Sequence, residues 1–159
     1  MTTKEAKATY KAAHLEYLRR RSTMPNSELI GIAKNSPQNF TTTNGITGAI
    51  IKYVTYRGGF ANRINTTGRK IKNKSRKEVF ITGTTKRGTA DISVIFPGFP
   101  AISIEVKNES TGDRISPYQS KVKAQIEAAG GIYFIATSFE GFMNWWHTDI
   151  EKTAPQIAA

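Results

Sequence analysis

The chain has 159 residues, which is long enough for one hydrophobic core and short for two. It contains no cysteine, which excludes disulfides, thiolate metal sites and a cysteine nucleophile. No apolar run approaches the length of a membrane span, and the first residues lack the apolar stretch of a signal peptide. We therefore expect a cytoplasmic protein with no membrane partner.

The net charge of +11 is concentrated in the middle of the chain. Residues 49–88 hold eleven Lys or Arg and one acid, Glu78, whereas residues 89–159 hold five Lys or Arg and eight acids. A polyanion is the natural partner of such a segment, because neutralising phosphates releases counterions. Basic surfaces also arise for solubility, so charge alone does not establish nucleic-acid binding.

Residues 1–43 are predicted to form a helix and a linker. Within residues 3–22, the apolar side chains at helical spacing are Ala6, Tyr10, Ala13, Tyr17 and Leu18. This apolar face is thin, so we expect a weakly docked, solvated helix. Residues 24–43 are rich in Pro, Asn, Ser and Thr, which predicts a linker with about one helical turn.

The main domain is expected over residues 44–150, with a flexible tail at 151–159. A helical stripe over 46–54 ends at Gly58-Gly59, and residues 60–65 alternate as a strand. A turn at 66–68 leads into residues 69–77, which carry six cations and no acid. We expect that segment to be a loop that grips a phosphate backbone, with a merely solvated loop as the alternative.

The second half of the domain has clearer patterns. Residues 78–82 are a strand candidate, and the apolar runs 91–96 and 102–107 are joined by Pro97-Gly98-Phe99-Pro100, which predicts a hairpin. A helix over 117–129, a buried strand over 132–136 and a last helix beginning after Ser138 follow.

The predicted hairpin brings charged side chains together. Side chains alternate across a strand, so Glu105 and Lys107 share one face, and folding back brings Asp91 close to the level of Glu105. Two carboxylates and a lysine suit a hard divalent cation and a phosphodiester. The alternative is an exposed polar face with a weak ion pair.

The order helix, strand, two-strand hairpin, helix, strand, with Asp before the hairpin turn and Glu-x-Lys after it, resembles the PD-(D/E)XK nuclease superfamily. Within it, the chain looks most like the VRR-NUC type and the Holliday-junction-resolvase-like nucleases of phages and mobile elements. The resemblance covers about residues 44–146. Its motifs are Arg63-Ile64-Asn65 with Gly68, Gly88-Thr89-Ala90-Asp91-Ile92, Ile104-Glu105-Val106-Lys107, Ser116-Pro117-Tyr118-Gln119 and Gly130-Gly131.

The resemblance implies an α/β fold with a restriction-endonuclease-like αβββαβ core, a mixed central sheet flanked by helices, and an N-terminal helical extension. It implies that Asp91, Glu105 and the Val106 carbonyl hold Mg²⁺, which Mn²⁺ can replace. Lys107 would position or help activate the attacking water, and Gln119 would line the site. Residues 116–119 also form a capping-box pattern, which explains Gln119 by structure alone.

The resemblance also places basic residues at the substrate. Arg63 and Asn65 would lie near the scissile phosphate or brace the site. The expected nucleic-acid contacts are Arg63, Asn65, Arg69, Lys70, Lys72, Lys74, Arg76, Lys77, Lys86 and Arg87.

The chain departs from the superfamily pattern in two ways: Ala90 replaces the proline before the first acid, and residues 41–47 offer no acid where many members carry one. Asn44 is a weak polar substitute there, so one metal ion is better supported than two.

The expected function is that of a Mg²⁺-dependent endodeoxyribonuclease that hydrolyses phosphodiester bonds in DNA, specific for structures such as junctions or flaps, with no small-molecule cofactor. A junction-cleaving enzyme needs two sites across a two-fold axis, so a homodimer with residues 3–22 in the contact is one expectation. The alternative is a catalytically degenerate DNA-binding protein that uses the basic segment 52–87. An RNA partner ranks lower, because no aromatic single-strand platform is evident.

Overall fold

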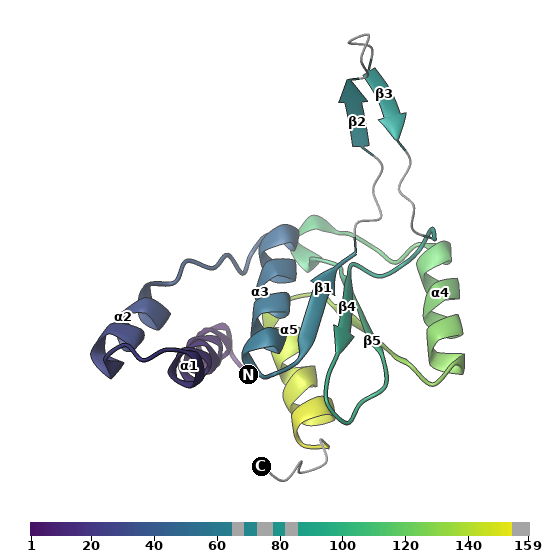
Figure 1. Cartoon of the computed structure of the whole chain (residues 1–159). Coiled ribbons are helices and arrows are strands. Elements are labelled where there is room, and N and C mark those ends of the chain that lie inside the picture. The colour runs from purple at the N-terminus through teal and green to yellow at the C-terminus, as the bar shows by residue number, and fades with distance from the viewer. Residues whose placement is uncertain (65–68, 73–77, 82–85, 154–159) are drawn as a thin grey trace.

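The computed structural model describes residues 1–64, 69–72, 78–81 and 86–153. Over these residues the protein is mixed α/β, with five helices and a four-stranded mixed sheet (Figure 1). The helices are α1 (Thr3–Arg21), α2 (Asn26–Asn35), α3 (Thr43–Tyr56), α4 (Pro117–Ala128) and α5 (Phe139–Trp145), with a 3₁₀ turn at Glu109–Thr111 and a π-helical end at Trp146–Glu151. The strands are β1 (Phe60–Arg63), β2 (Arg69–Lys72), β3 (Glu78–Ile81), β4 (Ile92–Ile95), β5 (Ile102–Val106) and β6 (Ile132–Ala136).

The strand order of the central sheet is β1-β4-β5-β6. β1 and β5 both run antiparallel to β4, whereas β6 runs parallel to β5. The predicted hairpin of β4 and β5 is confirmed, with Ile92 opposite Ile104. This topology places the ends of β1 and β5, the start of β4, and the N-terminal ends of α3 and α4 at one edge of the sheet (Figure 1).

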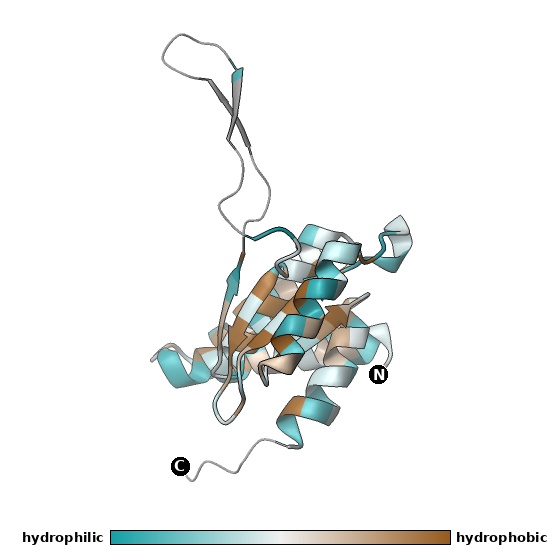
Figure 2. Ribbon diagram, turned by 90° about the vertical axis from the view of Figure 1, so that its right-hand side faces the viewer, coloured by the Kyte–Doolittle hydropathy of each residue, from teal (hydrophilic) through white to brown (hydrophobic). Residues whose placement is uncertain are grey.

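One face of the sheet forms the core against α3 and α5. The side chains of this face that are almost fully buried are Ile92, Val94, Ile102, Ile104, Val106 and Ala136. Figure 2 shows the apolar residues gathered along the strands and the helix faces that meet them. α4 covers the opposite face next to β6, so side chains of β5 that point away from the core, including Glu105, lie on the α4 side.

The N-terminal helix packs more firmly than its sequence suggests. Tyr10 is 1% exposed and makes edge contacts with Phe40 and Phe139, so α1 shares the core with α3 and α5. The expectation of a solvated helix is therefore wrong, because one buried aromatic side chain and two buried alanines suffice for docking. Among the described helices, none is both long and apolar enough to cross a membrane.

Two other segments differ from the expected ones. The stretch expected as a linker contains α2, which packs against α1 through Leu29 and Ala33. The basic segment expected as a loop begins with β2, which pairs with β3 as a separate two-stranded ribbon. Within the described residues, this ribbon contacts no other helix or strand, and it projects from the sheet edge where α3 and α4 begin (Figure 1).

Candidate active site

Backbone contacts hold Asp91 at the start of β4. Its Oδ2 atom accepts a hydrogen bond from the Val106 amide at 3.0 Å, and its carbonyl oxygen accepts one from the Ile64 amide at 2.7 Å. Asp91 is thereby fixed between the ends of β1 and β5. Its carboxylate therefore contacts Val106, which directly follows Glu105 in β5.

Glu105 is a buried carboxylate, only 3% exposed. Its Oε1 atom accepts hydrogen bonds from the Lys107 ammonium, at 3.2 Å, and from the Gln119 amide. Its Oε2 atom is buried and has no hydrogen-bond partner in the part of the chain that the structure describes. Burial and the nearby Asp91 carboxylate raise the pKa of Glu105 to about 7, against the opposing effect of Lys107.

Lys107 lies between two carboxylates. Its Nζ atom is 3.2 Å from Glu105 Oε1 and 3.2 Å from Asp113 Oδ2. Burial alone lowers the pKa of Lys107, but Asp113 and Glu105 outweigh that effect and raise it. The ammonium is therefore a fixed cation at neutral pH, suited to donating hydrogen bonds rather than accepting a proton.

Gln119 has both of the roles that its sequence suggests. Its Oε1 atom accepts from the Ser116 amide at 2.8 Å and Ser116 Oγ accepts from the Gln119 amide, which completes a capping box at the start of α4. Its Nε2 atom donates to Glu105. The cap therefore orients the side chain that holds Glu105.

Two residues near the site were missed by sequence reasoning. Asp113 reaches Lys107 from the loop after β5, and the only signal for it was an acid in a polar loop. Tyr133 lies on the same face of the sheet as Glu105, and its buried hydroxyl meets the geometry of a hydrogen bond with none of the described residues, although it is near enough to the Glu105 carboxylate to interact with it. Burial and the carboxylates of Glu105 and Asp91 raise the pKa of Tyr133. No local pattern predicts this approach, which depends on the pairing of β5 with β6.

Arg63 lies at the same edge of the sheet, at the end of β1. It is exposed, and its guanidinium donates to the Asn44 side chain in the first turn of α3 at 2.8 Å. Asn44, which the sequence offers as a weak polar substitute for an acid on this helix, therefore binds the Arg63 guanidinium. Three of the other predicted nucleic-acid contacts lie in β2: Arg69, Lys70 and Lys72. Four more lie outside the described residues: Asn65, Lys74, Arg76 and Lys77.

Lys86 and Arg87 lie against α4. Lys86 donates to the Gln125 side chain at 2.7 Å, and the Arg87 guanidinium lies 3.9 Å from the ring centroid of Tyr118. The next residue, Gly88, has a φ of +88°, and a Cβ there would lie 2.5 Å from the Tyr118 carbonyl oxygen. The chain that leads to Asp91 is thus packed tightly on the first turn of α4.

The donor set fits one hard cation. The unpartnered Glu105 oxygen and the Asp91 carboxylate are oxygen ligands of the kind that Mg²⁺ prefers. The described residues contain no group of three or more His, Asp or Glu side chains arranged to hold a metal ion. Water and substrate oxygens would have to complete the shell, as is usual for Mg²⁺. The Val106 amide contacts Asp91, and the role of its carbonyl as a ligand stays a prediction.

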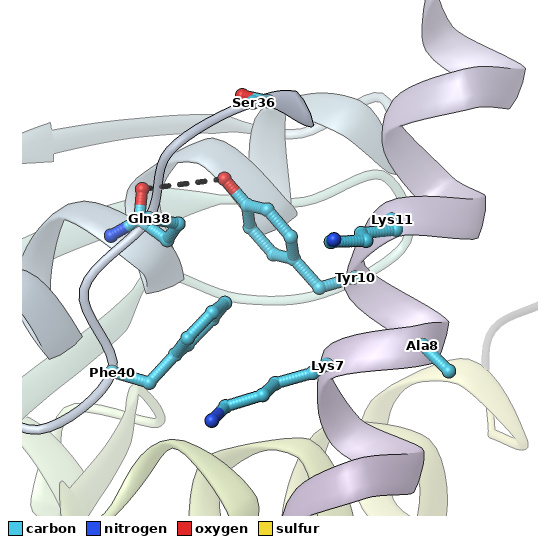
Figure 3. A pocket seen from close by; sticks show the side chains of 7 residues that line it. All are labelled: Lys7, Ala8, Tyr10, Lys11, Ser36, Gln38 and Phe40. Carbon is cyan, nitrogen blue, oxygen red and sulfur yellow. Dashed lines mark hydrogen bonds between the residues drawn. The ribbon is translucent and has the colours of Figure 1, made fainter. Parts of the chain in front are cut away.

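A pocket of about 370 Å³ lies elsewhere, between α1 and residues 36–40 (Figure 3). The Tyr10 hydroxyl donates to Gln38 at 3.4 Å at its wall, and the Lys7 ammonium lies 5.7 Å from the centre of the Phe40 ring. No acidic side chain lines this pocket, and it shares no residue with the cluster around Glu105. The carboxylate cluster around Glu105 therefore lies at the sheet edge and not in this pocket.

Comparison with known proteins gives no family for this chain: neither a protein-family model nor a curated protein matches it.

Proposed function

We propose that this protein is a metal-dependent DNA nuclease with a restriction-endonuclease-like core, in which Asp91 and Glu105 bind one Mg²⁺. One observation carries the proposal. The buried Glu105 carboxylate has its Lys107 and Gln119 donors on one oxygen, while its other oxygen is buried with no hydrogen-bond partner among the described residues. An unsatisfied buried carboxylate oxygen is costly, and a bound cation removes that cost.

Each residue of the cluster has a task in hydrolysis. A bound Mg²⁺ polarises the phosphodiester and lowers the pKa of the attacking water. Asp91 and Glu105 supply negative oxygens, and Gln119 fixes the orientation of the Glu105 carboxylate. Lys107 donates hydrogen bonds, to orient the water or to stabilise charge that develops on the phosphate oxygens.

The surroundings of the cluster favour an anionic substrate. The positive ends of α3 and α4 lie at the same edge of the sheet, and a helix N-terminus favours anions. Arg63 is exposed at this edge. Two further cations of the basic segment 52–87, Lys86 and Arg87, lie shortly before Asp91 in the chain and against α4. Together these features support a nucleic-acid backbone as the substrate.

Cleavage of labelled junction, flap, single-stranded and duplex DNA with Mg²⁺ or Mn²⁺ tests the proposal. Alanine at Asp91, Glu105 or Lys107 should abolish cleavage and leave folding and DNA binding largely intact. Glu127→Gln is the matched control, because Glu127 is exposed on α4 and pairs with Lys123, away from the cluster around Glu105. Undiminished cleavage by the three alanine variants would contradict the proposal.

The second candidate function is DNA binding without cleavage. It is favoured by residues 41–47, which contain no acid on the helix where many members of the resembled superfamily carry one, and by Asn44 in that stretch, which accepts from Arg63. Calorimetric titration of Mg²⁺ into wild type and Asp91→Asn separates the candidates. A nuclease should bind the ion through Asp91 and lose it in the variant, whereas a pure binding protein should show no site-specific Mg²⁺ binding in either.

A further inference from the structure

A second surface lies beside the cluster, on the outward side of α4. It is a pocket of about 270 Å³ between α4 and the chain segment that leads to Asp91. The pocket is lined by Lys86, Arg87, Tyr118, Lys121, Val122 and Gln125. The four α4 residues recur at helical spacing, so they form one continuous strip of the helix surface.

The lining combines cations with an accessible aromatic ring. Lys86, Arg87 and Lys121 are exposed, and none of the lining side chains is acidic. Tyr118 is 48% exposed even though Arg87 stacks over it. Val122 is 8% exposed and supplies an apolar floor. A surface salt-bridge network would need acids, and this strip has none.

Such a lining matches the two parts of a nucleotide. A base stacks on an aromatic ring or a guanidinium plane, and ammonium groups bind the adjoining phosphate. Bases in a duplex are already stacked on each other, so only an unpaired base can use the ring. The lining therefore selects for single-stranded nucleic acid over a continuous duplex.

The pocket lies close to the proposed cleavage site. Arg87 is four residues before Asp91, which limits their separation to about 14 Å. Tyr118 directly precedes Gln119, whose amide holds Glu105. At about 3.4 Å per nucleotide along a B-form strand, 14 Å corresponds to at most about four nucleotides, and to fewer in an extended single strand.

We propose that this pocket binds one unpaired nucleotide of the DNA substrate, within a few nucleotides of the cleaved bond, and so directs the protein to DNA with a single-stranded segment. The inference rests on the proposed nuclease function. It narrows the substrate class to flaps, overhangs and single strands.

Binding without metal tests the inference separately from cleavage. The affinity of a labelled twelve-residue oligo-dT and of a blunt duplex of equal length is measured in EDTA by fluorescence anisotropy. Tyr118→Leu should weaken oligo-dT binding about tenfold and duplex binding less than twofold, and Tyr118→Phe should bind oligo-dT like wild type. Unchanged oligo-dT affinity in Tyr118→Leu, or an equal loss on the duplex, overturns the inference.

A lysine pair on α4 gives a matched charge control. Lys121→Gln should reduce the slope of log affinity against log salt by about 0.7, the value for one phosphate contact on a single strand. Lys123→Gln should not, because Lys123 pairs with Glu127 and lies outside the pocket. Equal effects of the two substitutions contradict the inference. If oligo-dT binding follows these expectations and no variant or wild type cleaves with Mg²⁺, the pocket stands and the nuclease proposal fails.

Discussion

Glu105 occupies an unusual position for a carboxylate, because it is buried next to Asp91 and satisfied on one oxygen only. A solely structural acid would be expected to have both oxygens paired. The raised pKa of Glu105 expresses the same conflict, since burial and Asp91 both disfavour its charged form. Cation binding resolves that conflict, which is the physical basis of the proposed metal site.

The pH dependence of stability should report the burial of Glu105. In the metal-free protein the pKa of Glu105 is about 7, above its ordinary 4.5, so the folded state keeps a proton that the unfolded state has released. The free energy of unfolding should therefore decrease as the pH rises from about 4.5 to 7, by up to about 3 kcal/mol from this group. Glu105→Gln should remove this decrease, measured by urea unfolding in EDTA at pH 5 and pH 8. Equal pH dependence in both proteins would contradict it.

The two roles of Gln119 can be separated by substitution. Ser116→Ala removes the hydroxyl half of the capping box, and Gln119→Ala removes the side-chain amide half together with the contact with Glu105, so both should lose about 1 kcal/mol of stability. Only Gln119→Ala should slow cleavage, about tenfold, because it frees the Glu105 carboxylate. Thermal melts and single-turnover rates measure the two effects. A similar loss of cleavage in Ser116→Ala would show that the cap alone matters.

At the scale of single residues, the sequence predicts the charged cluster better than its surroundings. The period of two along β5 places Glu105 and Lys107 on one face, and the turn at 97–100 predicts the approach of Asp91. Tyr133 and Asp113 could not be predicted, because a parallel strand pair and a loop bring them close. Such long-range contacts leave no local pattern.

At the scale of elements, the segment before β4 is held against α4 by a glycine. Gly88→Ala places a Cβ against the backbone of Tyr118, whereas Gly112 also has a positive φ but open space around it. Both alanine substitutions should cost about 1 kcal/mol for the left-handed backbone. Gly88→Ala should cost about 1–3 kcal/mol more for the clash, measured by urea unfolding. Equal losses would mean that the contact with α4 contributes nothing.

The β2–β3 ribbon is an element that the core does not need. It contacts no other helix or strand among the described residues. A variant with a short Gly-Ser linker in place of residues 69–81 should therefore keep its melting temperature within about 2 °C, since about 1 kcal/mol corresponds to 2–4 °C. Its DNA affinity should fall, with the salt slope reduced by about 0.9 for each lost duplex phosphate contact.

A charge control distinguishes the ribbon from the total charge. Lys4→Gln with Lys11→Gln removes two positive charges from α1 and should leave the salt slope nearly unchanged. An equal reduction in that variant, or a ribbon replacement that binds DNA like wild type, would show that the ribbon does not contact DNA.

Elements with strong local signals were predictable from the sequence. Branched apolar residues alternate in β4 and β5, and Ser116-Pro117 with Gln119 marks the start of α4, so the predictions for these elements are confirmed. β2 was missed because Arg-Lys-Ile-Lys has a single apolar residue and becomes a strand only by pairing with β3. α2 was missed because its short apolar patch is stabilised by packing on α1.

At the scale of the whole molecule, the fold brings the charged residues of the candidate site together at one edge of the sheet. The antiparallel order of β1, β4 and β5 brings Arg63, Asp91 and Glu105 to that edge, and two helices start there. Most of the net positive charge lies in residues 49–88, while residues 89–159 carry eight of the twelve acids. This separation suits a protein that attracts a polyanion and holds a cation at the point of contact. A homodimer stays a prediction.

The most direct test is the single-turnover rate of DNA cleavage as a function of Mg²⁺ concentration, for wild type, Asp91→Asn, Glu105→Gln and the control Glu127→Gln. We predict a wild-type rate that saturates with Mg²⁺, an unchanged control, and a loss of at least about 100-fold in the two site variants. A wild-type rate that does not depend on Mg²⁺, or Asp91→Asn and Glu105→Gln variants that cleave like the control, would contradict the proposed metal site.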